Sequence, residues 1–308
     1  MFEIITKLLC FFLFCKKNSE HNQSKTEYRP VVLIHGLNGN ANSLNTLKEH
    51  IINEHPTTEI ILPAIYENIE SYTNLWKQVD AYYQIIKKIP NESENGINIV
   101  AHSQGGIIAR AIIETKKDLR VNNFIALSSP LNGQFGDTSA LNWLPFWLRN
   151  EASYLFYTEE MQYLCSIAGY WKDPHKFPKY QKYSSFLANL NNQSTSEKEL
   201  HKFNTQWKLN FIKLNNFVMI GGPQDGVITP WQSSQMGSYL EDGIYKNNLK
   251  EIPVVDMRSL KIYKDDVFGL KTLDKANKIH TYTFDGVEHH QWTRNKTIFD
   301  QAILPWLD

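Results

Sequence analysis

From Tyr28 onward, short runs of β-branched residues alternate with longer segments in which apolar residues recur every three or four positions. The short runs predict buried strands, and the longer segments predict amphipathic helices. The predicted strands cover residues 31–34, 59–65, 97–101, 124–127, 217–220 and 279–284. The predicted helices cover residues 43–53, 72–86, 106–117 and 293–307. This alternation is typical of βαβ units, so we predict an α/β fold with a mostly parallel, doubly wound sheet.

The alternation breaks after Pro130. Between Trp143 and Phe186, thirteen of forty-four residues are aromatic, more than twice the average density of the chain. We interpret residues 131–207 as an insertion that forms a helical, aromatic-rich lid subdomain, and residues 26–308 as one α/β domain that contains it. The simpler alternative is that these aromatic side chains only form the core of the insertion.

The first 25 residues are distinct from this domain. An apolar stretch from Ile4 to Cys15 precedes a polar run, which is typical of a signal peptide or leader and is shorter than the 20 or so residues that a membrane-spanning helix needs. An uncleaved anchor is the alternative. Four Asn-x-Ser/Thr triplets permit glycosylation on the secretory route, at Asn22, Asn91, Asn192 and Asn295.

Composition excludes several classes of protein. Among the 308 residues, 42% are hydrophobic and 21% are charged, which is typical of a globular chain and not of a disordered one. Thirty-two basic residues balance thirty-two acidic ones, so we expect no nucleic-acid partner. We expect no stable transmembrane anchoring once the leader is removed. The three cysteines, Cys10, Cys15 and Cys165, cannot form a disulfide framework.

The strongest chemical signal is Ser103 in the sequence AHSQGG (residues 101–106), between a predicted strand and a predicted helix. Small residues two positions before and two after the serine allow a strained strand-to-helix turn that lifts the hydroxyl above the edge of the sheet. This pattern predicts the nucleophile of an α/β-hydrolase fold. The alternative is a serine that caps an ordinary helix.

A serine nucleophile needs a base, and the base needs an orienting acid. In this fold the order along the chain is serine, acid, histidine. Asp225 follows the strand at 217–220 and His289 follows the last strand, so we predict these two as acid and base. Spacing leaves open His290 as the base, and Asp256, Asp265 and Asp285 as the acid.

Two backbone amides are candidates for an oxyanion hole. One belongs to Gln104, directly after the nucleophile, and the other to Leu37, where Gly36 lets the backbone approach closely. We expect His35 to act in packing and hydrogen bonding. No cofactor or metal is expected, because the neighbouring histidines at 289 and 290 lack the helical ligand spacing of hydrolytic zinc sites.

From about Arg29 to the carboxyl terminus, the sequence resembles the palmitoyl-protein thioesterases, and the lysosomal type-2 branch more than the type-1 branch. The segments that carry the resemblance are VLIHGL (32–37), SQGG (103–106), LSSP (127–130), GQFGD (133–137), YWKDPH (170–175), SSFLA (184–188), IGGPQDGVITPWQSS (220–234), FGLKTL (268–273) and PWL (305–307).

This resemblance implies a serine thioesterase that hydrolyses long-chain fatty acyl thioesters, such as palmitoyl-CoA or S-palmitoylated proteins, through an acyl-enzyme. It also implies Ser103, Asp225 and His289 as the triad, with the Leu37 and Gln104 amides as the oxyanion hole. A signal peptide, glycosylation and a lysosomal or secreted location follow from the same likeness. One departure is that family members carry disulfides, whereas only Cys165 remains beyond the leader here.

The residues leave the cleaved bond open. A lipase or carboxylesterase would use the same triad on oxygen esters, and a non-catalytic lipid-binding protein is a further alternative. Burying a long acyl chain at about 0.8 kcal/mol per methylene requires an apolar groove, whose walls we expect in the aromatic insertion. His289 must be neutral to act as a base, so we expect maximal activity near or above neutral pH.

Overall fold

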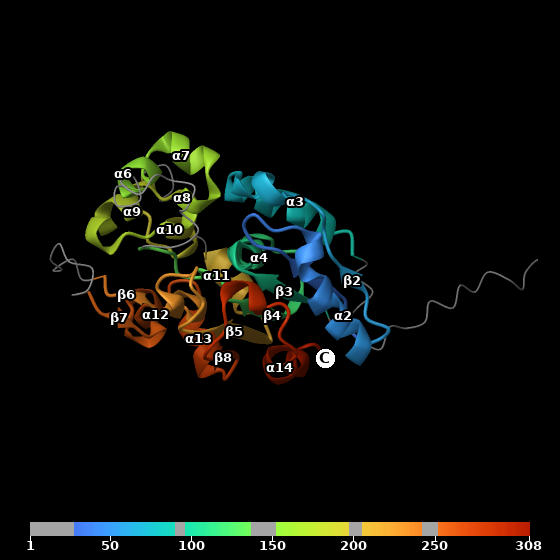
Figure 1. The fold of residues 1–308 in the computed structure, drawn as a ribbon. Coiled ribbons are helices and arrows are strands. Elements are labelled where there is room, and N and C mark those ends of the chain that lie inside the picture. The colour runs from blue at the N-terminus through green and yellow to red at the C-terminus, as the bar shows by residue number, and fades with distance from the viewer. Residues whose placement is uncertain (1–27, 90–95, 137–151, 197–204, 242–251) are drawn as a thin grey trace, which may run out of the picture.

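The computed structural model describes residues 28–89, 96–136, 152–196, 205–241 and 252–308. Its centre is a sheet with the strand order β2-β1-β3-β4-β5-β8, in which all neighbouring strands are parallel (Figure 1). The strands are β1 (Val31–Ile34), β2 (Ile60–Ile61), β3 (Ile97–His102), β4 (Val121–Leu127), β5 (Asn216–Gly221) and β8 (Ile279–Thr283). After β1 the chain adds β2 on one side of it, and then crosses back over β1 to add β3 on the other side. The predicted doubly wound α/β-hydrolase fold is therefore confirmed.

Alternate strand residues face two separate cores. Val31 and Leu33 pack with α2 (Asn45–Glu54) and with the carboxyl-terminal segment that contains Trp292 and Phe299. Val32 and Ile34 belong to the core on the other face. That core includes α3 (Leu75–Ile86), α4 (Gln104–Thr115) and α11 (Thr205–Phe211). Both faces of the sheet are therefore covered, which explains why its strands read as continuous apolar runs.

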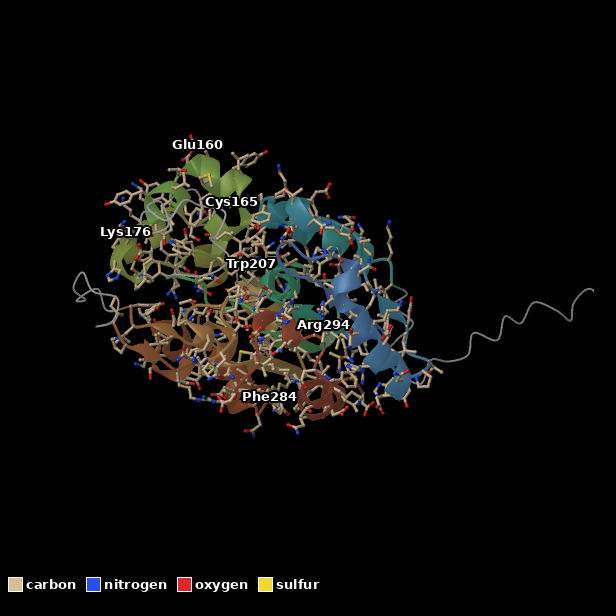
Figure 2. The ribbon with its side chains drawn as sticks, in the orientation of Figure 1. Glu160, Cys165, Lys176, Trp207, Phe284 and Arg294 are labelled. Atoms are coloured by element: carbon tan, nitrogen blue, oxygen red, sulfur yellow. The ribbon has the colours of Figure 1, made fainter. Side chains whose placement is uncertain are left out.

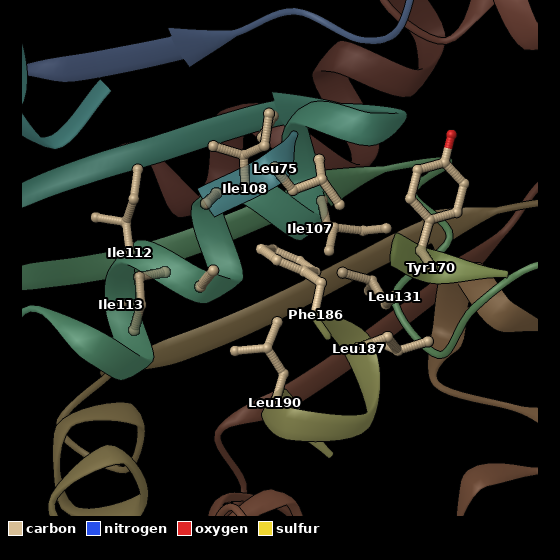
Figure 3. Packing of buried hydrophobic residues seen from close by; sticks show 14 of the residues in the cluster. Leu75, Ile107, Ile108, Ile112, Ile113, Leu131, Tyr170, Phe186, Leu187 and Leu190 are labelled. Atoms are coloured by element: carbon tan, nitrogen blue, oxygen red, sulfur yellow. The ribbon is translucent and has the colours of Figure 1, made fainter. Parts of the chain in front are cut away.

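The described part of the predicted insertion is helical. Its helices are α6 (Ala152–Phe156), α7 (Glu159–Leu164), α8 (Ser166–Tyr170), η4 (Pro174–Lys176), α9 (Phe177–Tyr183) and α10 (Leu187–Leu190). Figure 3 shows Phe186, Leu187 and Leu190 packing toward Ile107 and Ile108 of α4. The buried aromatic side chains of the insertion thus share one core with α4 and do not form a separate core. Residues 137–151 and 197–204 of the predicted insertion lie outside the described residues.

Two predicted elements differ from the structure. Only Ile60 and Ile61 of the predicted strand 59–65 pair with β1, because β2 lies at the edge of the sheet and Pro63 follows two residues after its end. The predicted single helix at 293–307 is wrong. In the structure this segment is divided into α14 (Lys296–Ile298), the π-helix η9 (Phe299–Ile303) and η10 (Leu304–Trp306), which contains Pro305.

The remaining elements are short and lie in the segments between and after the strands of the sheet. They are η1 (Ala41–Leu44), η2 (Asn68–Tyr72), η5 (Trp231–Gln235), η7 (Met257–Ser259), α12 (Lys261–Lys264), α13 (Leu270–Lys275), η8 (His289–Gln291) and the antiparallel pair β6 (Ser238–Tyr239) and β7 (Val254–Val255). The antiparallel pair was not predicted, since each strand has only two residues.

Within the described ranges, no helix is both long and apolar enough to cross a bilayer. The predicted leader, with Cys10 and Cys15, lies outside those ranges. Cys165 is buried and carries a free thiol, and its burial raises the pKa of that thiol. Among the described residues Cys165 has no disulfide partner, and its surroundings are apolar core.

Candidate active site

Ser103 lies in the tight turn between β3 and α4. Its backbone has φ 55° and ψ −129°, a conformation that is strained for any residue with a side chain. The Ser103 amide donates to the Leu127 carbonyl oxygen at 2.9 Å, which fixes the turn to β4. A Cβ atom added to Gly105 would lie 2.6 Å from the carbonyl oxygen of Ile34, so the turn requires glycine there. The turn holds the Ser103 hydroxyl at the carboxyl edge of the sheet.

Two further loops bring His289 and Asp225 to Ser103. The Ser103 hydroxyl oxygen lies 2.9 Å from Nε2 of His289, which is 186 residues away in sequence. Nδ1 of His289 lies 2.9 Å from Oδ2 and 3.0 Å from Oδ1 of Asp225. With the proton of the neutral imidazole on Nδ1, His289 donates to the carboxylate and accepts from the serine hydroxyl. The geometry is that of a base held between a nucleophile and an acid.

Asp225 is buried, and it accepts hydrogen bonds from several directions. The Ile228 amide donates at 2.7 Å, the Trp292 indole N–H at 2.7 Å and the Ser128 hydroxyl at 2.5 Å. Burial alone would raise the pKa of the carboxyl group. The bonds from His289, Ile228 and Ser128 outweigh burial and hold that pKa at about 2, so the carboxylate is ionised over the whole range in which proteins function.

Ser128 and Trp292 were not predicted from the sequence as partners of Asp225. Ser128 follows β4 at φ 41°, and its side chain is fully buried. A polar residue at the carboxyl end of a buried strand is a signal that would have identified it, because sites in open α/β sheets gather at that edge. No comparable signal marks Trp292, whose apolar ring belongs to the core behind the site.

His102, also missed, supports the loop that carries His289. Its Nε2 lies 3.1 Å from the backbone oxygen of His289, and the two rings lie 4.7 Å apart between centroids. Burial, together with the nearby His289 side chain, lowers the pKa of His102 to about 3. His102 is therefore neutral at ordinary pH and adds no positive charge beside His289 when it donates to the backbone.

The loop after β1 packs directly against the serine. A Cβ atom added to Gly36 would lie 2.6 Å from Cβ of Ser103, so only glycine permits this approach. Beyond Leu37, the Asn38 amide donates to the Ser71 hydroxyl at 2.7 Å, and the Gln104 side chain donates to the Ser71 carbonyl at 2.8 Å. These bonds join the loop that contains Leu37, η2 and the start of α4 into one unit next to Ser103.

The Gln104 amide is free for an anion because it belongs to the first turn of α4, where the helix offers no acceptor. The positive end of the helix dipole lies at the same point. His35 is buried behind this loop, and its ring nitrogens lie 2.9 Å from the Gly36 carbonyl and 3.1 Å from the Ile65 carbonyl. His35 thus packs and bonds to the backbone, as expected.

The alternative residues lie elsewhere. His290 exposes 64% of its side chain beside Glu288. Asp256 caps η7, Asp265 pairs with Lys261, and Asp285 is exposed. Among the described residues, no group of three His, Cys, Asp or Glu side chains is arranged to hold a metal ion.

The family model and the curated relatives agree on one family. Residues 30–289 match the family described as palmitoyl protein thioesterase. Lysosomal thioesterase PPT2-B of Xenopus laevis is 39% identical, over 92% of this chain and 94% of that protein. Lysosomal thioesterase PPT2 of Homo sapiens is 37% identical, over 92% and 89%. Among solved structures, Bacillus licheniformis lipase BlEst2 in its mature form aligns with a TM-score of 0.49 and 14% identity, over 91% of this chain and 92% of that one.

Proposed function

Because the chain belongs to the palmitoyl protein thioesterase family and is a thioesterase hydrolase, we propose that it cleaves long-chain fatty acyl thioesters with Ser103 as nucleophile, His289 as base and Asp225 as acid. The observation that carries this proposal is the 2.9 Å contact between the Ser103 hydroxyl and Nε2 of His289. The buried carboxylate on the far side of the imidazole supports the same assignment.

In the first half of the reaction, the Ser103 oxygen attacks the acyl carbon while Nε2 of His289 takes its proton. The carbonyl oxygen becomes an oxyanion, which the amides of Leu37 and Gln104 stabilise. Ionised Asp225 stabilises the imidazolium that forms. The intermediate then collapses, and the C–S bond breaks to give an acyl-serine and a thiol that takes its proton from His289.

In the second half, His289 takes a proton from water, and the resulting hydroxide equivalent attacks the acyl-serine. Collapse of this second intermediate returns the proton to the Ser103 oxygen and releases the fatty acid. An ordinary thiol has a pKa of about 8.5, so a thiolate leaves with less help from an acid than an alkoxide does. The site therefore suits a thioester at least as well as an oxygen ester.

The acyl chain is the substrate feature that the insertion would recognise. Leu37, Tyr72 and Phe135 are partly buried apolar side chains that pack against the core on segments tied to the site. We place the acyl groove along them, beneath the inner side of the helices 152–190, whose buried side chains then act as a lid. At about 0.8 kcal/mol per methylene, a palmitoyl chain would gain on the order of 10 kcal/mol from burial there.

We also propose a lysosomal location, reached through the secretory pathway. The two relatives reported above are named lysosomal thioesterases. Of the four glycosylation triplets, Asn192 is exposed, and Asn295 caps α14 through its carbonyl oxygen while its nitrogen is left for a glycan. Asn22 and Asn91 lie outside the described residues.

The test compares acyl chains and leaving groups. We expect the full chain to hydrolyse palmitoyl-CoA at least tenfold faster than acetyl-CoA, and faster than a matched palmitoyl oxygen ester. Ser103→Ala should abolish both hydrolysis and labelling by a fluorophosphonate. Equal rates on acetyl and palmitoyl thioesters would exclude the acyl groove, and a preference for the oxygen ester would favour a lipase.

A further inference from the structure

The outer surface of the insertion exposes large apolar side chains that the proposed reaction does not use. Tyr154 is 58% exposed, Tyr163 60%, Leu164 63% and Tyr183 36%. The inner aromatic side chains of the same helices are buried, so the two sides of the insertion differ sharply. Apolar side chains that gather on one exposed surface mark an interaction site more often than scattered ones do.

Lysine ammonium groups cover these rings. Nζ of Lys176 lies 3.5 Å and Nζ of Lys179 4.6 Å from the ring centroid of Tyr154. Nζ of Lys182 lies 5.2 Å from the ring of Tyr183. The three lysines recur every third residue along η4 and α9, which places them on one side of these helices. Figure 2 shows Lys176 at the outer edge of the molecule.

The same surface continues toward α3. Tyr163, Lys182 and Tyr183 line one hollow of about 350 Å³, so α7 and α9 present a continuous face. On the other side of Tyr163, Nζ of Lys77 lies 4.4 Å from the ring centroid. We define the docking surface as Lys77, Tyr154, Tyr163, Leu164, Lys176, Lys179, Lys182 and Tyr183.

This surface is basic although the chain as a whole is neutral. No aspartate or glutamate occurs between residues 174 and 196, and the lysines of η4 and α9 lie in that stretch. In the described part of the insertion, the nearby carboxylates are Glu159 and Glu160, at the start of α7, and Glu159 also lines the hollow. Asp173 is buried and bonds to Ser153. Among the described residues that form this face, four lysines against two glutamates leave a positive excess.

We propose that the docking surface binds the surface of an anionic phospholipid bilayer. Tyrosine rings are amphipathic and lie at the level of lipid headgroups, while lysines beside them attract anionic headgroups. On the inner side of the insertion, α8 packs against η2. The Ser71 hydroxyl of η2 accepts a hydrogen bond from the Asn38 amide, in the loop beside Ser103. Docking would therefore hold the site close to the bilayer, where long-chain acyl groups partition. Binding needs no turnover, so this inference goes beyond the proposed hydrolysis.

The test is co-sedimentation of the full chain with lipid vesicles. We compare vesicles of phosphatidylcholine alone with vesicles in which roughly one lipid in three is phosphatidylserine. We expect binding only to the anionic vesicles, and weaker binding as salt shortens the range of the electrostatic attraction. The triple variant Lys176→Gln, Lys179→Gln, Lys182→Gln should bind about 100-fold more weakly, since each lysine near such a surface contributes about fivefold.

The matched control is Lys87→Gln, Lys88→Gln, Lys117→Gln. These lysines are also exposed, but they are not part of the docking surface. Lys87 and Lys117 instead lie close enough to Asp118 to help lower the pKa of its carboxyl group. The control loses the same charge and should bind vesicles like the wild type. Both variants should hydrolyse a soluble acyl thioester normally, which separates loss of docking from loss of the proposed function. Absent binding, equal binding to both vesicle types, or equal loss in both variants would overturn the proposal.

Discussion

Asp225 connects more of the molecule than any other residue at the site. Its carboxylate is bonded by groups from the loops that follow β4 and β5, from η8 and from the segment that follows η8. The bonds from Ser128, Ile228 and Trp292 are buried, and in such a low-dielectric region a bond to a charged group contributes about 1.5 to 3 kcal/mol. The position of His289 therefore depends on residues that never touch substrate.

Trp292→Phe should lower kcat by about 10- to 100-fold with little change in KM. The phenyl ring keeps the apolar packing but removes the N–H that donates to Asp225 at 2.7 Å, so the acid holds and stabilises His289 less well. The measurement is steady-state hydrolysis of palmitoyl-CoA. Trp306→Phe is the control, because that indole donates to the Tyr282 hydroxyl away from the site. Wild-type kcat in Trp292→Phe would show that this bond plays no part in positioning the acid.

Gly36→Ala should lower kcat by about 100-fold or more, as the loss of an oxyanion donor does. The added Cβ would lie 2.6 Å from Cβ of Ser103, so the loop that carries the Leu37 amide must move away. Gly96→Ala places a Cβ 2.7 Å from the Arg120 carbonyl at the other end of β3. It should lower the melting temperature but leave kcat per folded molecule unchanged, and similar kinetic losses in both variants would contradict this role for the loop.

At the scale of elements, α4 joins the site to the insertion. Every residue from Gln104 to Glu114 is buried, and Arg110 in its middle is fully buried. The Arg110 guanidinium donates to the Leu131 carbonyl at 2.9 Å, the Asn191 side chain at 2.9 Å and the Leu190 carbonyl at 3.2 Å. One side chain thus bonds to segments near both ends of the described insertion.

Arg110→Met should reduce the free energy of unfolding by about 3 to 5 kcal/mol, measured by urea denaturation. It removes the partner of the buried Glu114 carboxylate, which Arg110 contacts at 2.7 Å, and leaves the carbonyls of the insertion without a donor. The double variant Arg110→Met, Glu114→Leu should be more stable than the single one, because it leaves no unpaired carboxyl group. Equal stability of the two variants would mean that the ion pair contributes little.

The sequence predicted the sheet well for a physical reason. A parallel strand that is covered on both faces must be a continuous run of apolar, mostly β-branched residues, and this local requirement is visible in the chain. The predicted elements that differ from the structure are those whose form depends on tertiary contacts. β2 is an edge strand that pairs on one side only, and the closing helix is divided near Pro305.

The difference between local requirements, which the sequence shows, and tertiary contacts, which it does not show, also applies at the site. Ser103, Asp225 and His289 follow strands, so their positions could be predicted from strand order, and the structure brings them together. Ser128 and Trp292 could not be assigned, because their bonds to Asp225 span 97 and 67 residues and depend on how distant loops pack. Spacing also could not choose between His289 and His290, which the fold separates by exposure.

For the whole molecule, three buried groups make stability depend on pH in opposite directions. Asp225 has a pKa of about 2 when folded, below its ordinary 3.8, and His102 has about 3, below its ordinary 6.5. The unfolded chain binds these protons more tightly, so stability is lost as pH falls through those intervals. Burial raises the pKa of Glu114 from 4.5 to about 7, although Arg110 opposes the shift. The folded state holds that proton more tightly, so stability is lost as pH rises from 4.5 through 7.

Between pH 4.5 and 6.5, the effects of His102 and Glu114 oppose each other, so the free energy of unfolding of the wild type should change little there. Glu114→Gln removes the contribution to stability that is lost as pH rises. The free energy of unfolding of this variant should therefore increase with pH over this interval, by up to about 1.4 kcal/mol per pH unit. Urea denaturation at several pH values measures both curves. Glu49→Gln, at an exposed position on α2, is the control and should follow the wild type. Parallel curves for Glu114→Gln and the wild type would show that Glu114 stays ionised in the core, because Arg110 then outweighs burial.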